Sequence, residues 1–221
     1  MSRITGTIFR STALNESVNV FVPFDLPQSD PSLDSMQFSH LVKQATTAIG
    51  RLNAVSGLAH SVDWLIYAAL RKEALLTSQI EGTQATLDDL FDTEALITVD
   101  NPQDVKEVAN YVKAFQFVRS HLRNKHGSAS LPLCTRLLCE AHALFMDGAR
   151  GTTKQPGLIR QSQNWIGGTH PGNAIFVPPP PHEAPHSLTA LERFIHAPSD
   201  DIAPLLRVAL VHAQFETILP F

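Results

Sequence analysis

The sequence predicts a mostly α-helical protein with one small β element. Between residues 34 and 216, apolar residues recur at intervals of three and four, which is typical of amphipathic helices. Glycines and β-favouring segments instead gather between residues 148 and 181. With 221 residues, 43% of them hydrophobic and 17% charged, the chain is long and apolar enough to form one or two packed cores.

The N-terminal half is predicted to be an arm followed by a helical domain. Residues 1–32 are rich in Ser, Asn, Pro and Asp and lack a helical period, so we expect an arm that lies over a domain. Residues 33–100 form the expected N-terminal helical domain. Its first helix is indicated by an apolar stripe of Phe38, Leu41, Val42, Ala45, Ala48, Ile49 and Leu52.

Two further helices are predicted in the same domain. The second helix covers about residues 61–80 and stops at Gly82, because glycine is a common helix terminator. A short third helix would be capped by Thr86 or Asp88. Residues 99–104 then break the helical pattern, so we place a domain boundary near residue 100.

Residues 101–221 are expected to form the larger domain. One helix is predicted from a stripe of Val105, Val108, Ala109, Val112, Phe115, Val118 and Leu122. The next helix covers 133–146, with Ser130 as its cap and Pro132 in its first turn. Residues 148–181 predict a short hairpin or flap that ends in the stiff run Pro178–Pro181. Two last helices are expected at 187–196 and 203–216.

Charge and composition exclude several classes of function. The 17 Lys and Arg against 21 Asp and Glu give a net charge of −4 with no basic cluster, which argues against nucleic-acid binding. No apolar run is long enough to span a bilayer, and no leader peptide is recognisable at the N-terminus. Cys134 and Cys139 suggest neither a disulfide framework nor a zinc cluster. We therefore expect a cytoplasmic protein that does not contact a membrane.

The segment His182 to His186 matches the HExxH pattern of zinc hydrolases. Zinc binding would need both histidines on one face of a continuous helix. Four prolines precede the segment and Pro185 lies inside it, which places His182 outside any helix. The sequence therefore favours a polar turn before a helix over a zinc site, and we expect no bound zinc or other metal in this segment.

Four other segments carry more information together than alone. They are, in chain order, TSQIEG (77–82), PGLIR with NWIG (156–160 and 164–167), AIFVPPP (174–180) and HAQFETILPF (212–221). In this order and spacing they resemble the Fic family of AMP-transferring enzymes, in the branch whose N-terminal helical domain carries its own inhibitory helix. The resemblance extends from about residue 21 to residue 221 and implies a Fic-type helical bundle with a β-hairpin flap.

The resemblance implies a role for each segment. Thr77, Glu81 and Gly82 fall on the defining positions of the family's inhibitory motif, (S/T)xxxE(G/N). Ile175, Phe176 and Val177 resemble the flap that docks the target protein by main-chain pairing. The family's complete members transfer AMP from ATP, with magnesium, to a Ser, Thr or Tyr hydroxyl of a target protein, so the resemblance implies ATP and Mg²⁺ as ligands.

The last segment resembles the start of the family's catalytic loop, HPFxxGNGRxxR. His212, Phe215, Glu216, Pro220 and Phe221 match the residues that lead into this loop. The motif's histidine, which takes the proton from the target hydroxyl, is replaced by Leu219.

Leucine has no lone pair, and the phosphate-binding part of the motif would lie beyond Phe221. We therefore expect that no catalytic residue is retained, that productive ATP binding is lost and that the chain does not transfer AMP.

A non-enzymatic role is the alternative that the sequence leaves open. The flap and the helical platform would still bind a protein target, or Glu81 would be offered in trans to the arginine of an active Fic partner. The target protein is not identified by the sequence. A homo-oligomer and a second Fic protein both remain as expected partners.

Overall fold

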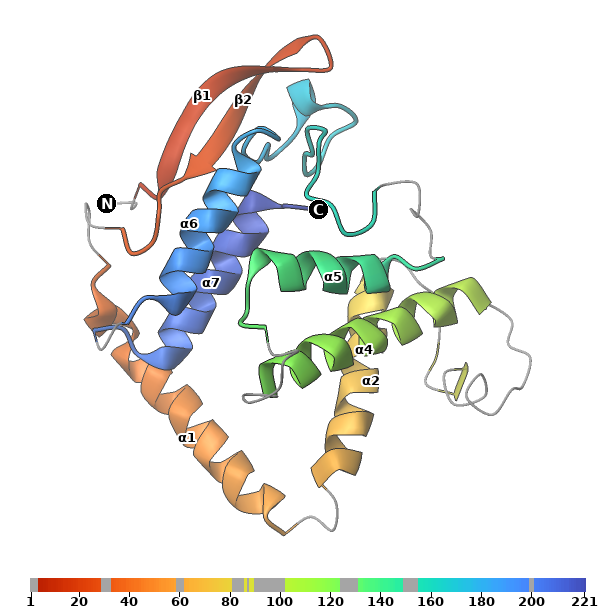
Figure 1. Ribbon diagram of the computed structural model, residues 1–221. Helices are drawn as coiled ribbons and strands as arrows, with labels where there is room; N and C mark the ends of the chain where they lie inside the picture. Colours follow the sequence, from red (N-terminus) through yellow and green to blue (C-terminus); the bar gives the residue numbers. More distant parts are fainter. Residues whose placement is uncertain are drawn as a thin grey trace. The chain divides into compact units, whose positions relative to one another are not determined.

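The structure, a computed structural model, describes residues 4–28, 33–58, 62–80, 86, 88–89, 102–123, 131–148, 155–198 and 201–221 (Figure 1). The predicted fold class is confirmed, since the described residues are mostly helical and include one two-stranded antiparallel sheet. The chain divides into two compact units, residues 1–52 with 159–221, and residues 53–158. The expected boundary near residue 100 lies outside the described residues and stays a prediction.

The first unit begins with a β-hairpin of β1 (Gly6–Ala13) and β2 (Glu16–Pro23). The strands pair in antiparallel register from Ala13 opposite Glu16 to Gly6 opposite Pro23. Both residues of the two-residue turn have positive φ, 50° at Leu14 and 64° at Asn15, as a type I′ turn requires. The sequence did not predict this hairpin within the arm expected for residues 1–32, and the arm as a separate region stays a prediction.

Alternation of apolar residues explains why the hairpin forms. Val18 and Val20 on β2 are buried with Ala13 and Val177, while Ser17 and Asn19, on either side of Val18 in the chain, are exposed. One face of the ribbon is thereby covered by the chain near residue 177. A two-stranded ribbon is marginal in water on its own, so this cover is what stabilises it.

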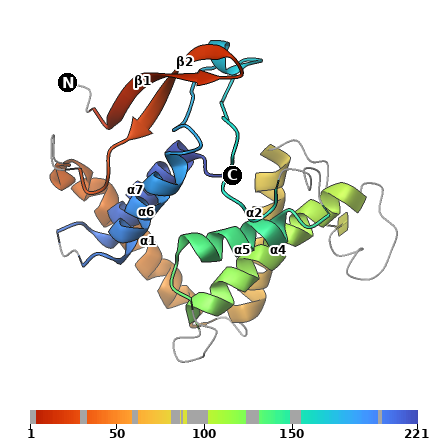
Figure 2. The ribbon, with the colours of Figure 1, turned by 45° about the horizontal axis from the view of Figure 1, so that its top comes forward.

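The rest of the first unit is built on two helices that lie side by side, α6 (Ala184–His196) and α7 (Pro204–Ile218) (Figures 1 and 2). Proline in the first turn opens each helix. Their shared core consists of Ala184, Leu188, Leu191, Phe194 and Ile218.

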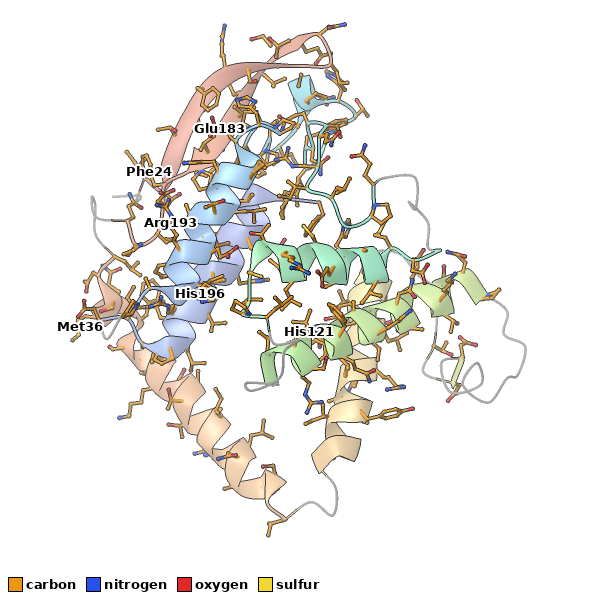
Figure 3. All side chains as sticks on the ribbon, viewed as in Figure 1. Phe24, Met36, His121, Glu183, Arg193 and His196 are labelled. Atoms are coloured by element: carbon orange, nitrogen blue, oxygen red, sulfur yellow. The ribbon has the colours of Figure 1, made fainter. Side chains whose placement is uncertain are left out.

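The chain leaving β2 is tied to these two helices by polar contacts. The Gln214 side chain donates to the Phe24 carbonyl at 2.9 Å, and Arg193 lies 3.6 Å from Asp25. Figure 3 labels Phe24 and Arg193 in this region. The hairpin is thus joined to the helices through the segment that follows it.

The structure places His182 in a turn before α6, because this helix begins at Ala184 with Pro185 in its first turn. The expected pre-helix turn is confirmed, whereas the expected helix start at residue 187 is three residues too late. His182 and His186 therefore do not share a continuous helix.

The hairpin that we expected between residues 148 and 181 is reduced to one isolated bridge, Ile166 to Phe176. Gly167 and Gly168, both with φ of 72°, turn the chain away directly after Ile166. A short 3₁₀ helix, η2 (Pro171–Asn173), then leads back to the bridge. Within the described residues, the two-stranded sheet lies at the N-terminus and the flap contributes only this bridge.

The second unit contains α2 (Val62–Ile80), α4 (Pro102–Arg123) and α5 (Thr135–Phe145). Its core joins α2 to α4 through Leu70, Ala74, Leu75, Val105, Val108 and Val112. The buried Asn110 side chain donates to the carbonyls of Phe145 and Asp147 at 3.0 and 2.8 Å, which satisfies the C-terminal end of α5. The predicted stripe of α4 is buried only in part, since Phe115 and Leu122 are exposed.

The predicted first helix is present as α1 (Ser39–Ser56), preceded by the short 3₁₀ helix η1 (Ser35–Phe38). None of the α1 side chains is buried, although the sequence predicted an apolar stripe. Cys134 is the N-cap residue of α5, while the expected cap Ser130 lies outside the described residues.

Of the third predicted helix, only three residues are described. The Thr86 and Asp89 side chains each bind the other's main-chain N–H, which supports Thr86 as the cap. Among the helices described, none has the length and apolar character needed to cross a bilayer.

Candidate functional site

Helix α7 ends at the position where the sequence placed the start of a catalytic loop. Leu219 is the C-cap residue and adopts the left-handed conformation, with φ 47° and ψ 65°. Its N–H donates to the Phe215 carbonyl at 3.1 Å. A left-handed leucine costs roughly 1–2 kcal/mol, so the surrounding structure must hold it in place.

Arg160 stabilises this conformation through hydrogen bonds. Its guanidinium donates to four main-chain carbonyls, those of Leu219 at 2.6 Å, Ile218 at 3.2 Å, Pro179 at 2.5 Å and Ser162 at 3.3 Å. Its own N–H donates to the Pro220 carbonyl at 2.9 Å. One side chain thus joins the end of α7 to the polyproline segment that precedes α6, and we call this set of bonds the Arg160 clamp.

The clamp holds a buried positive charge. Arg160 is only 7% exposed, and among the described residues no carboxylate pairs with it. Burial lowers the pKa of Arg160 to about 10, which still leaves the group charged at neutral pH. The negative end of the α7 dipole, where the Ile218 and Leu219 carbonyls lie, compensates part of this charge.

Two neighbouring side chains extend the same arrangement. Asn164 donates to the Phe221 carbonyl at 2.9 Å, and Gln163 donates to the Pro178 carbonyl at 3.1 Å. The polar residues of the segment 160–164 therefore bind main chain on both sides of the site. They fix the path of the chain from residue 218 to residue 221 without using any side chain of that path.

The flap is held by main-chain hydrogen bonds to two segments. Ile166 and Phe176 exchange bonds of 2.8 and 3.1 Å, the Ile175 N–H also donates to the Ile166 carbonyl at 2.9 Å, and the Phe21 N–H of β2 donates to the Val177 carbonyl at 2.9 Å. Of the three predicted flap residues, Ile175 is 87% exposed, Phe176 is half-buried and Val177 is buried. The exposed Ile175 lies beside Gly167, where an added Cβ would be 2.7 Å from the Ile175 Cδ1.

The other predicted site residues are spread over both units. On α7, His212 and Glu216 are exposed, and the half-buried Phe215 ring lies 6.5 Å from the Phe221 ring. Thr77 is half-buried on α2. The remaining two positions of the inhibitory motif, Glu81 and Gly82, lie outside the described residues, so the inhibitory role stays a prediction.

The side chains at the loop start do not suit the chemistry of a general base or a metal ligand. Leu219, Pro220 and Phe221 are apolar and can neither accept a proton nor bind a cation. Their nearest polar groups are carbonyls, and those of residues 218–221 already accept bonds from Arg160 and Asn164. The side chains of the loop start therefore offer neither a proton acceptor nor a metal ligand.

Comparison with known proteins bears directly on this site. Residues 39–119 match the profile of the Fic/DOC family N-terminal domain, and residues 132–221 match the profile of the Fic/DOC family. The second match contains the Arg160 clamp, the flap and the loop start.

The chain belongs to the Fic family.

A solved Fic family protein from Desulfovibrio desulfuricans shares this fold, with a TM-score of 0.61 and 21% sequence identity. The alignment covers 86% of the present chain and 54% of the solved one, so the chain spans about half the length of that Fic protein. At this identity the likeness shows the fold alone.

The Fic assignment was predicted from the sequence, but the residues that shape the site were not. Arg160 and Asn164 lie in the segments 156–160 and 164–167 that the family resemblance singles out, and Gln163 lies between these segments, yet no function could be given to any of the three from the sequence. Their partners are main-chain carbonyls, which every residue carries. A polar side chain in an otherwise apolar β-favouring stretch was the only signal available.

Proposed function

We propose that this Fic-family chain binds a protein target through its flap and does not transfer AMP by the histidine-dependent route of the family. The observation that carries the proposal is Leu219 at the position of the general base. A general base typically contributes about 10²- to 10⁴-fold to the rate, and a leucine cannot replace it.

The contacts around Leu219 support the proposal that the main-chain conformation of the loop start does not depend on a histidine at this position. The Arg160 clamp, the left-handed Leu219 and the Asn164 bond to Phe221 all act on main-chain atoms. A histidine or a leucine would meet the same bonds. Replacement of the base therefore needs no rearrangement of the fold.

The flap supports the binding half of the proposal. Ile175 is almost fully exposed on an extended segment whose neighbouring residue, Phe176, is already paired with Ile166. An extended segment with an exposed apolar side chain is suited to binding another extended peptide. This binding does not require residue 219.

The proposal is tested by incubating the complete gene product with ATP labelled in the α-phosphate, together with a lysate as a source of targets. We expect no label on any protein above the level of a heat-denatured control. Label that appears only with the folded protein would contradict the proposal. A parallel reaction with an active Fic enzyme shows that the lysate contains a protein that can be modified.

A further inference from the structure

The segment 166–177 forms a loop that ends in the flap and lies against strand β2. The bridge between Ile166 and Phe176 closes this loop, and η2 lies inside it. Strand β2 lies beside η2 in both ribbon views (Figures 1 and 2). All of these residues belong to one compact unit, so the N-terminal hairpin is a structural neighbour of the flap.

Two polar contacts attach the loop to β2. At the start of the strand, Nδ1 of His170 lies 2.7 Å from Oε2 of Glu16. Toward its end, the Phe21 N–H donates to the Val177 carbonyl at 2.9 Å, and the Val177 side chain is buried against the apolar face of the hairpin. An extended chain rises about 17 Å over the five steps between these positions, so the loop is held at two well-separated points.

The local structure of η2 fits the Glu16 carboxylate. His170 is the N-cap residue of η2, and its main-chain N–H donates to the Asn173 side chain at 3.1 Å. A Cβ added at Gly172 would collide with Oε2 of Glu16. Because an ionised carboxylate only accepts hydrogen bonds, the His170 ring must carry a hydrogen on Nδ1. Contact with Glu16 thus restricts both the position of η2 and the hydrogen on the His170 ring.

The exposure of this pair argues against a role in overall stability. The side chains of His170 and Glu16 are 45% and 43% exposed. Exposed ion pairs contribute little to the free energy of unfolding, because water screens both charges. The effect of the pair is therefore local, at the end of the loop that lies away from the Phe21 bond.

We propose that Glu16 is a positioning residue of the flap. Through His170 it holds η2 against β2, and η2 leads directly into the segment that presents the exposed Ile175. The proposal rests on the target-binding role proposed above for the flap, and it makes the N-terminal hairpin the support of that flap. Loss of the Glu16 carboxylate then opens the Ile166–Phe176 bridge more often and leaves the rest of the fold intact.

Amide hydrogen exchange of the complete chain tests the proposal. The Ile175 and Phe176 amides both donate to the Ile166 carbonyl, at 2.9 and 3.1 Å, so their protection reports on the bridge. In Glu16→Ala we expect both amides to exchange about two- to fivefold faster, with an unchanged urea denaturation curve, because one exposed pair is lost. Unchanged exchange of both amides would overturn the proposal.

Two further variants separate the pair from a general loss of charge. Glu140→Ala on α5 breaks another exposed pair, with Arg136 at 2.8 Å, and should leave exchange in the flap unchanged. In a His170→Ala background, Glu16→Ala should have no further effect, because its partner is already absent. Acceleration of the same size by Glu140→Ala, or by Glu16→Ala in both backgrounds, would overturn the proposal.

The ring nitrogens of His170 give a spectroscopic readout that a change in stability would not move. At alkaline pH, where the ring is neutral, their ¹⁵N shifts should show the hydrogen on Nδ1, and Glu16→Ala should redistribute it between Nδ1 and Nε2. Identical ring shifts with and without Glu16 would overturn the pair. Since both measurements use the chain without a target, a flap that binds no protein would refute the proposed function and leave the support by Glu16 in place.

Discussion

The loop start and the flap of this Fic protein are held in opposite ways. The chain from residue 218 to residue 221 accepts hydrogen bonds at every carbonyl, from the Arg160 clamp and from Asn164. The flap is fixed by main-chain bonds to Ile166 and by one bond from Phe21, with no side-chain donor comparable to Arg160 among the described bonds of residues 175–177, and the Ile175 side chain is 87% exposed.

This difference separates two requirements of the site. A catalytic loop has to start at a defined position, which main-chain bonds secure independently of the side chain at residue 219. A docking segment instead needs free surface and adaptable contacts. The main-chain bonds of the loop start do not depend on the side chain at residue 219, and the binding role proposed for the flap does not depend on it either.

The largest effect is expected from Arg160→Met, which should lower the free energy of unfolding by about 4 kcal/mol. The change removes the donors of four carbonyl contacts in a site that is 7% exposed. Urea denaturation measures this decrease in the free energy of unfolding. Arg160→Lys keeps the charge but not the planar fork and should lose about half as much. A loss below about 1 kcal/mol for Arg160→Met would show that the clamp does not hold the loop start.

A matched pair of isoleucines tests the contrast in packing. Ile218 is fully buried at the end of α7. Ile218→Ala should lower the free energy of unfolding by about 3 kcal/mol, because it removes contacts and leaves a cavity. Ile175→Ala in the flap should stay within about 0.5 kcal/mol. Thermal unfolding of both variants gives the comparison. Equal destabilisation would mean that the flap is part of the packed core.

A pair of glycines tests the backbone of the flap. Gly167 has a φ of 72°, so Gly167→Ala should destabilise by about 1–2 kcal/mol. A Cβ added at Gly50 in α1 would have no other atom within 4 Å. Gly50→Ala should therefore raise the free energy of unfolding by about 0.5–1 kcal/mol. Opposite signs in urea denaturation are the expected result, and the same sign for both would contradict the assigned turn.

Lowering the pH should destabilise the contact between Gly157 and His142 in the second unit but leave the Arg160 clamp unchanged. The Gly157 N–H donates to Nδ1 of His142 at 3.1 Å, and burial holds the pKa of His142 below its usual 6.5. The stabilisation from neutral His142 is present above pH 6.5 and is lost as the pH falls through the lowered pKa.

Amide hydrogen exchange should show this as reduced protection at Gly157, once the pH dependence of intrinsic exchange is removed. Protection at Leu219 should not change, because Arg160 keeps its charge throughout this range. His142→Gln should remove the pH step at Gly157. A parallel loss of protection at both positions would mean that the two regions are not independent.

The helices could be predicted from the sequence because their apolar spacing is regular. The stripe of Val105, Val108 and Val112 correctly predicted α4, and the helices expected at 187–196 and 203–216 are present as α6 and α7, with starts within a few residues of the expected ones. The β-hairpin was missed although Val18, Val20 and Val22 alternate. Its turn, Leu14-Asn15, has no glycine, and a leucine at positive φ is not a usual turn signal.

The sequence predicted those features of the site that depend on the identity of a side chain, and not those that depend on main-chain contacts. The absence of a base at Leu219 was visible in the sequence, whereas the Arg160 clamp was not, because its acceptors are main-chain carbonyls 19 and 58–59 residues away. Such contacts depend on the tertiary fold. The flap residues were located by family resemblance, whereas their main-chain bonds to Ile166 and Phe21 and the exposure of Ile175 are seen only in the structure.

We propose that Leu219 prevents AMP transfer by the histidine-dependent route while the main chain of the loop start stays intact. The most direct measurement compares the complete gene product with its L219H variant in the labelled-ATP reaction, with unfolding curves to confirm equal stability. We expect labelling by L219H at least about 10²-fold above that by the unchanged protein. Labelling by the unchanged protein at the level of L219H would contradict the account.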